Sequence, residues 1–191
     1  MVALEIVVWV LAVLVTAGTV AAAVIAAVRH TPALALVAVG PVAIGALMLA
    51  FRLAVPAPAH ALWVLLALAV AALGVVAGGP LTVLVLRMTA PAQRQGVAGG
   101  IVVDDEKTDQ PREVLRGGAI IGYLERIAIV VAIVVGHPEA VAVIIAIKGL
   151  GRFSELVAPE VRERFIIGTF VSFIWAAACG GVIWLAGGLV P

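Results

Sequence analysis

Long uninterrupted apolar stretches constrain this chain more than any other feature of its sequence. Residues 2–28 contain one charged side chain, Glu5, and residues 33–51 and 61–86 contain none. A helix needs about 20 predominantly apolar residues to cross the hydrocarbon core of a bilayer. Together with 64% hydrophobic residues and a mean hydropathy of +1.26, these stretches exclude a soluble globular domain.

We therefore predict an all-α, polytopic integral membrane bundle of about six transmembrane helices, because backbone polar groups in lipid must be satisfied within each helix. Residues 1–86 form an N-terminal three-helix half, residues 87–116 a polar loop, and residues 117–191 a C-terminal three-helix half. The fifth span is short, since its uninterrupted apolar part covers only Ala140 to Ile147. A full crossing and a re-entrant helix both fit that length.

Basic residues are distributed unequally between the two ends of the predicted bundle. Arg52 lies alone at the end that carries both termini. Nine of the twelve lysines and arginines lie at the other end: Arg29, Arg87, Arg94, Lys107, Arg112, Arg116, Arg152, Arg162 and Arg164. Cytoplasmic loops of membrane proteins are enriched in Lys and Arg, so the loop is predicted to be cytoplasmic and both termini extracytoplasmic.

Residues 116–155 form a predicted helical hairpin that carries charge at membrane depth. Its turn includes Gly136 and His137, a glycine being suited to the positive φ that often ends a helix. Glu125 lies twelve residues before His137 and Lys148 eleven after it. With a rise of about 1.5 Å per residue, both lie roughly 17 Å from the turn, level with each other. We expect a buried Glu125–Lys148 ion pair, because unpaired charges are costly at that depth.

Small residues accompany these charges. Gly118 and Gly122 share one helix stripe with Glu125, and their GxxxG spacing is typical of helices that approach each other closely. Gly74 and Gly78 repeat the spacing in the third span. We expect close helix packing at both pairs. Homo-oligomerisation is expected through small-residue faces, either Gly74 and Gly78 or the stripe of Ser172, Ala176 and Gly180.

The charges of the hairpin do not cancel. Three basic residues, Arg126, Lys148 and Arg152, stand against Glu125 and, if it lies deep enough, Glu155. The excess of one or two positive charges calls for an anionic partner: a lipid headgroup, a substrate, a second protomer or water. In the alternative interpretation, Arg126 and Arg152 snorkel to an interface and Glu125–Lys148 is only a packing lock.

Three segments carry a resemblance to known proteins: Ile121–Arg126 (IGYLER), Lys148–Phe153 (KGLGRF) and Glu163–Ser172 (ERFIIGTFVS). Over about residues 116–180, the chain resembles a family of small, functionally uncharacterised multi-spanning membrane proteins of actinobacteria. It is also similar to the C-terminal membrane segment of a bacterial domain-of-unknown-function family. The resemblance implies that these residues matter, and it implies no catalytic role. We expect the protein in the bacterial inner (cytoplasmic) membrane.

No catalytic motif appears in the sequence, neither a GxxxxGK phosphate loop nor a serine elbow nor HExxH, and no metal site or cofactor is predicted. The net charge of +1 argues against nucleic acid as a partner. Three functions stay open. The first is an ion- or proton-linked transporter or channel that uses the Glu/Lys/Arg cluster. The second is a non-catalytic membrane assembly or regulatory subunit, and the third is a membrane enzyme acting on an anionic lipid.

Overall fold

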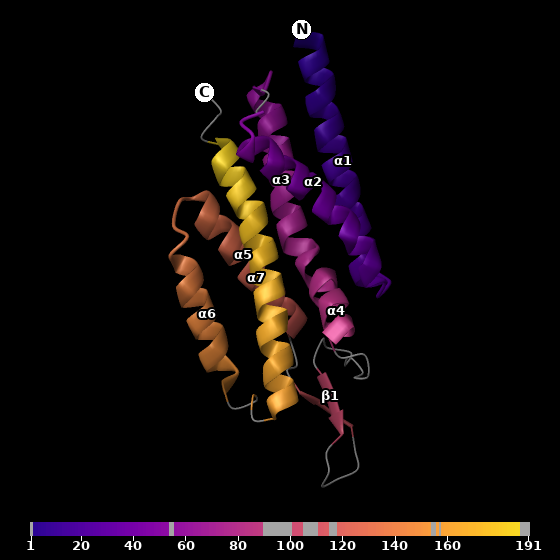
Figure 1. Ribbon diagram of the computed structural model, residues 1–191, viewed down its shortest axis with the longest axis vertical. Helices are drawn as coiled ribbons and strands as arrows, with labels where there is room; N and C mark the ends of the chain where they lie inside the picture. Colours follow the sequence, from indigo (N-terminus) through magenta and orange to yellow (C-terminus); the bar gives the residue numbers. More distant parts are fainter. Residues whose placement is uncertain are drawn as a thin grey trace.

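The computed structural model describes residues 2–53, 56–89, 101–104, 111–114, 118–153, 156 and 158–187. These residues form a bundle of helices with one small β-sheet (Figure 1). The elements in chain order are α1 (Val2–Val28), the 3₁₀-helix η1 (Pro32–Ala38), α2 (Val39–Ala50), α3 (His60–Val76), α4 (Gly78–Thr89), β1 (Ile101–Asp104), β2 (Pro111–Val114), α5 (Gly118–Val134), α6 (Ala140–Gly151) and α7 (Pro159–Gly187).

The helices run up and down the long axis of the bundle, and both chain termini lie at one end (Figure 1). We call this the terminal end; it also holds the α2–α3 connection. The opposite end, called the loop end, holds the end of α4, the β-sheet and the start of α7. This arrangement places Arg52 at the terminal end, and Arg87 and Arg164 at the loop end.

Four helices in the described part of the chain are long and apolar enough to cross a membrane: Ala3–Val28, Pro32–Ala50, His60–Thr89 and Pro159–Gly187. The predicted helical membrane bundle is therefore confirmed. The two helices of the charged hairpin are shorter, with 17 residues in α5 and 12 in α6. The 12 residues of α6 rise about 18 Å, well below the about 30 Å of a hydrocarbon core. On this length α6 is not a full span by itself.

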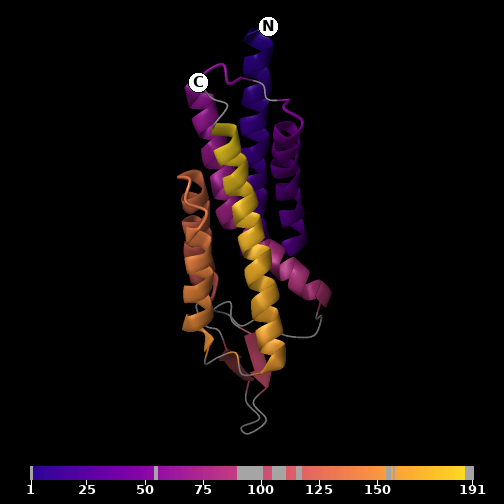
Figure 2. The same ribbon diagram turned by 60° about the vertical axis from the view of Figure 1, so that its left-hand side comes forward.

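The third span is interrupted near Pro80. α3 ends at Val76, α4 begins at Gly78, and Figure 2 shows α4 turning away from the axis of α3. Pro80 has no backbone N–H, so the carbonyl of Val76 loses its donor four residues on, and the proline ring crowds the preceding turn. The interruption leaves carbonyl groups at the end of α3 available to other donors.

α7 is the central helix of the bundle and packs against α2, α3, α4 and α5. The core between these helices includes the fully buried Leu73, Ile129 and Cys179. Gly74 gives α3 close access to α7, because a Cβ at this position would lie 2.9 Å from Cys179 Cβ.

The small-residue stripes are used inside the chain. Gly74 and Gly78 are buried, and so are the three members of the second stripe, Ser172, Ala176 and Gly180. The expectation that these two faces pack against a second copy is therefore wrong, since neighbouring helices of the same chain already cover them. Homo-oligomerisation stays a prediction that needs another surface.

The hairpin turn has the backbone conformation that its sequence predicts. Gly136 has φ +86°, and His137 N–H donates to Ala132 O at 2.7 Å. This bond satisfies a carbonyl in the last turn of α5. Beyond the turn, His137 Nδ1 and the exposed Glu139 Oε1 lie 2.9 Å apart.

The polar loop contains a structure that the sequence analysis does not predict. β1 and β2 pair antiparallel, with Ile101 opposite Val114 and Asp104 opposite Pro111. Residues 90–100, 105–110 and 115–117 of the predicted loop 87–116 lie outside the described residues.

Candidate functional site

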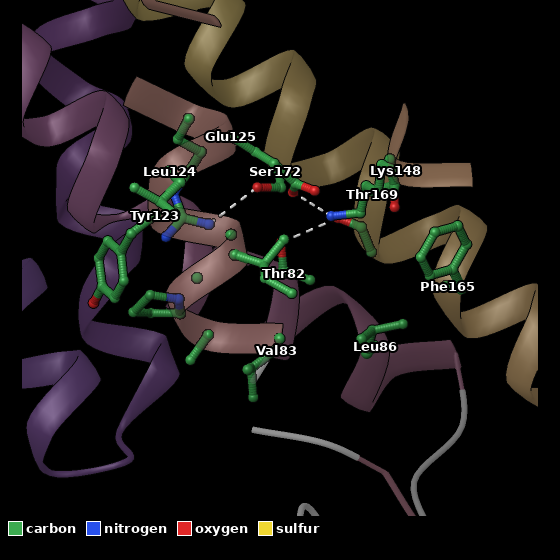
Figure 3. A pocket seen from close by; sticks show the side chains of 18 of the residues that line it. Thr82, Val83, Leu86, Tyr123, Leu124, Glu125, Lys148, Phe165, Thr169 and Ser172 are labelled. Atoms are coloured by element: carbon green, nitrogen blue, oxygen red, sulfur yellow. Dashed lines mark hydrogen bonds and ion pairs between the residues drawn. The ribbon is translucent and has the colours of Figure 1, made fainter. Parts of the chain in front are cut away.

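A cavity of ≈ 740 Å³ lies at the loop end of the bundle, walled by α4, α5, α6 and α7 and by the end of α1 (Figure 3). It extends from the loop end to the level of Glu125 and Arg126 on α5. The charged residues that line it are Arg87, Glu125, Arg126, Lys148, Arg152 and Arg164. Gly118 and Gly122 line it as well, on the first turns of α5. The structure thus brings most of the predicted cluster to one cavity; Glu155 lies outside the described residues.

Glu125 and Lys148 form the ion pair that their levels in the hairpin predict, with Lys148 Nζ donating to Glu125 Oε2. Protein covers most of both side chains, which are 9% and 16% exposed respectively. The ammonium group also lies 5.4 Å from the ring centroid of Phe173 and 5.8 Å from that of Phe165, both on α7. Through this lysine, α6 is held to α5 by charge and to α7 by cation–π contacts.

Arg126 is the most deeply placed cation of the cavity, with 4% of the residue exposed. Its Nε donates to Val75 O at 2.5 Å, and its Nη1 donates to Ser172 Oγ at 3.1 Å. Its Cζ lies 4.8 Å from the ring centroid of Tyr123. The alternative that Arg126 snorkels to an interface is therefore wrong, because the guanidinium is enclosed by α3, α5 and α7.

The partner of Arg126 on α3 is a carbonyl next to the helix interruption. In an unbroken helix Val75 O would accept from Gly79 N–H, and here the guanidinium occupies that carbonyl. A second side chain acts on the same turn, since Trp175 Nε1 donates to Leu73 O at 3.1 Å. The end of α3 is thus capped by side chains from α5 and α7.

Glycines make the space for this arginine. A Cβ on Gly78 would lie 2.5 Å from Arg126 Cδ, closer than side-chain carbons approach. A Cβ on Gly122 would lie 3.1 Å from Arg126 Nη1, and one on Gly79 3.8 Å from Nη2. Gly122 therefore accommodates the arginine one turn along its own helix, whereas the sequence pattern suggested close approach of another helix.

Two hydroxyl groups on α7 complete the inner part of the cavity. The sequence analysis gives Ser172 a packing role only and does not single out Thr169. Thr169 and Ser172 are three residues apart, so they share one face of α7, and both line the cavity (Figure 3). Ser172 accepts from Arg126. Thr169 Oγ1 is buried and has no hydrogen-bond partner among the described residues. The sequence signal that could have identified them is the presence of hydroxyl side chains within an otherwise apolar span.

The described lining residues carry five basic side chains and one carboxylate. The carboxylate, Glu125, is engaged by Lys148, and the hydrogen bonds of Arg126 go to neutral oxygens. The positive charge of Arg126 is therefore not neutralised by a direct ion pair in the described part of the chain. Chemically, the inner cavity offers a guanidinium and two hydroxyls, a set that suits an oxyanion.

Comparisons with protein-family models, with curated proteins and with solved structures find no match to this chain. The resemblance to small actinobacterial membrane proteins therefore stays a prediction, and the argument about function depends on the cavity itself.

The Glu125–Lys148 ion pair predicts that the stability losses of the two single substitutions do not add up in the double variant. Glu125→Ala should lower thermal stability in detergent more than Glu125→Ala combined with Lys148→Ala, because the single change leaves a mostly buried ammonium without its carboxylate. Such one-sided losses cost about 3–5 kcal/mol in soluble proteins. Couplings between membrane helices average about 0.6 kcal/mol, and we expect this pair to reach or exceed that value.

Arg87→Ala provides the matched control, because Arg87 lines the same cavity but is exposed and not paired with Glu125. Its effect should add to that of Glu125→Ala. Additive losses in the Glu125/Lys148 cycle as well would show that the two charges do not stabilise each other.

Proposed function

We propose that this protein is a membrane carrier for an anionic substrate that binds at Arg126. The observation that carries the proposal is a cationic cavity at the loop end that reaches a buried arginine whose hydrogen-bond partners among the described residues are all neutral. A buried charge without a counter-charge is strongly unfavourable, and an anion at the end of the cavity would remove that cost.

The donors at this position favour a phosphate-type group over a carboxylate. Arg126 supplies a planar fork of N–H groups, and Ser172 accepts from it while keeping its own proton for another acceptor. Thr169 supplies a second hydroxyl proton from the same helix face. Three donor groups match an anion with three peripheral oxygens, and arginine is well suited to phosphate recognition.

A carrier fits the shape of the bundle better than an open channel does. A second cavity of ≈ 410 Å³ lies at the terminal end, lined by Trp63, Val134, Ile183, Trp184, Leu185 and Gly187. Between the two cavities, α3, α5 and α7 contribute the fully buried Leu73, Ile129 and Cys179. These buried residues therefore separate the two cavities in this conformation, as expected of a carrier that opens to one side of the membrane at a time.

The interruption of the third span makes α4 a helix whose position the substrate can change. Arg126 joins the substrate position to Val75 O at the end of α3. An anion that draws the guanidinium toward itself weakens this bond and frees α4 to pivot about Ala77. Broken helices lining a midplane site are a common arrangement in transporters.

The enzyme alternative has less support. Glu125 is the single carboxylate among the described lining residues, and Lys148 Nζ already donates to it. Of the three functions left open by the sequence, transport is the one that uses the cavity, its charge and the helix interruption together.

We infer that the loop end faces the cytoplasm of a bacterial cell and that both termini are extracytoplasmic. The excess of basic residues at the loop end supports this orientation. In intact cells, Met88→Cys at the end of α4 should be protected from a membrane-impermeant thiol reagent, and Leu53→Cys at the terminal end should react. Both positions are exposed, and the native Cys179 is fully buried. The reverse labelling pattern would overturn the orientation.

Transport is testable in proteoliposomes with three phosphate-bearing probes: inorganic phosphate, glycerol phosphate and a fluorescent short-chain phosphatidic acid. At least one should cross faster with the protein than in protein-free vesicles. Arg126→Lys keeps the charge but loses the paired donation to Val75 O and Ser172, and charge-assisted hydrogen bonds contribute about 1.5–3 kcal/mol. We expect the rate to fall at least about tenfold.

Arg29→Lys is the matched control, because Arg29 is exposed near the loop end and does not line the cavity. It should transport like the unmodified protein. Equal rates with and without the protein for all three probes would contradict the carrier function.

A further inference from the structure

We propose that the substrate is an amphiphile, a phosphate headgroup attached to an apolar tail, which enters the cavity sideways from the bilayer between α5 and α6. This inference rests on the proposed function and specifies the substrate class. Its headgroup would lie at Arg126, Ser172 and Thr169, and its tail along the apolar walls toward the lipid.

The wall formed by α5 and α6 carries exposed apolar side chains. Ile121, Leu124 and Ile147 line the cavity and are 40%, 62% and 65% exposed. α6 contains no buried residue, and a Cβ on Gly149 or Gly151 would meet nothing within 4 Å. The exposed apolar side chains and the light packing of α6 make this side of the cavity the route by which an acyl chain would reach it.

The position of the phosphate headgroup in the cavity follows from which hydroxyl groups still have a proton to donate. Thr82 also lines the cavity, but its hydroxyl already donates to Gly78 O at 2.8 Å and reaches Gly168 O at 3.5 Å. Thr169 also lines the cavity, but its Oγ1 is buried without a partner in the described part of the chain. An anion needs donors, so Thr169 is a binding group and Thr82 is not.

The tail explains how a phosphate reaches such a depth. A free phosphate ion would have to shed its water to enter a mostly apolar cavity, which is costly. A lipid-anchored phosphate is already concentrated at the membrane, and its tail exchanges one apolar environment for another. The volume of ≈ 740 Å³ also lies in the range of about 300–1,000 Å³ that is typical of sites for ligands much larger than phosphate.

Thermal unfolding of the full chain in neutral detergent tests the substrate class. Dodecyl phosphate, dodecylphosphocholine and inorganic phosphate are compared at equal concentration. Dodecyl phosphate at about 100 times its dissociation constant should raise Tm by about 5–10 °C, and the other two should raise it far less. An equal rise with dodecylphosphocholine would overturn the inference, since the anionic head would then not be recognised.

The result with inorganic phosphate separates this inference from the proposed function. If inorganic phosphate raises Tm as much as dodecyl phosphate does, the amphiphile is wrong and a carrier for a soluble anion stands. If neither phosphate raises Tm, the anion site itself is wrong, and the proposed function fails with it.

Two matched variant pairs locate the ligand. Thr169→Val should leave the ligand-free Tm unchanged and abolish most of the shift with dodecyl phosphate, whereas Thr82→Val should keep the shift.

Ile147→Trp fills the side opening and should reduce the shift, whereas Ile174→Trp on α7, with the same 65% exposure but outside the cavity, should not. Equal shifts within either pair would overturn the corresponding headgroup or tail assignment.

Discussion

A buried arginine is the constraint on which the rest of this bundle depends. Arg126 lies among helices that are otherwise almost wholly apolar, and a cation there is unfavourable unless it is paired or hydrogen-bonded. The fold engages Nε with Val75 O and Nη1 with Ser172 Oγ, and Cζ lies over the ring of Tyr123; all three partners are neutral. The positive charge is therefore retained and N–H groups remain for a further acceptor, which makes the inner cavity attractive to an anion.

Several features of the neighbouring helices follow from accommodating this side chain. Glycines at 78 and 122 leave room for it, and the interruption between α3 and α4 presents the carbonyl that it caps. α4 turns away from the axis of α3 at that point (Figure 2), and the cavity that reaches Arg126 lies at this end of the bundle. The Glu125–Lys148 pair has a different role, since it neutralises itself and fastens α6 to the rest of the bundle.

The sequence predicts the features that depend on local periodicity and depth. It predicts the helical membrane bundle, the positive φ of Gly136 and the pairing of Glu125 with Lys148, because helix rise alone puts those two charges at one level. It does not predict which helices outside the hairpin become neighbours. The packing of α5 against α3 and α7 therefore could not be anticipated, nor could the burial of Arg126 or the use of Gly74 and Gly78 inside the chain. Thr169 acquires its role only through that packing.

The central claim, that Arg126 is held against the helix interruption in a space kept open by glycine, is tested most directly by the thermal stability of Gly78→Ala. The added Cβ would lie 2.5 Å from Arg126 Cδ, and such overpacking typically costs about 1–3 kcal/mol. Gly18→Ala in α1, where a Cβ meets nothing within 4 Å, should cost nothing. In an Arg126→Ala background the Gly78→Ala penalty should largely disappear. A Gly78→Ala protein as stable as Gly18→Ala, or an unchanged penalty without the arginine, would contradict the account.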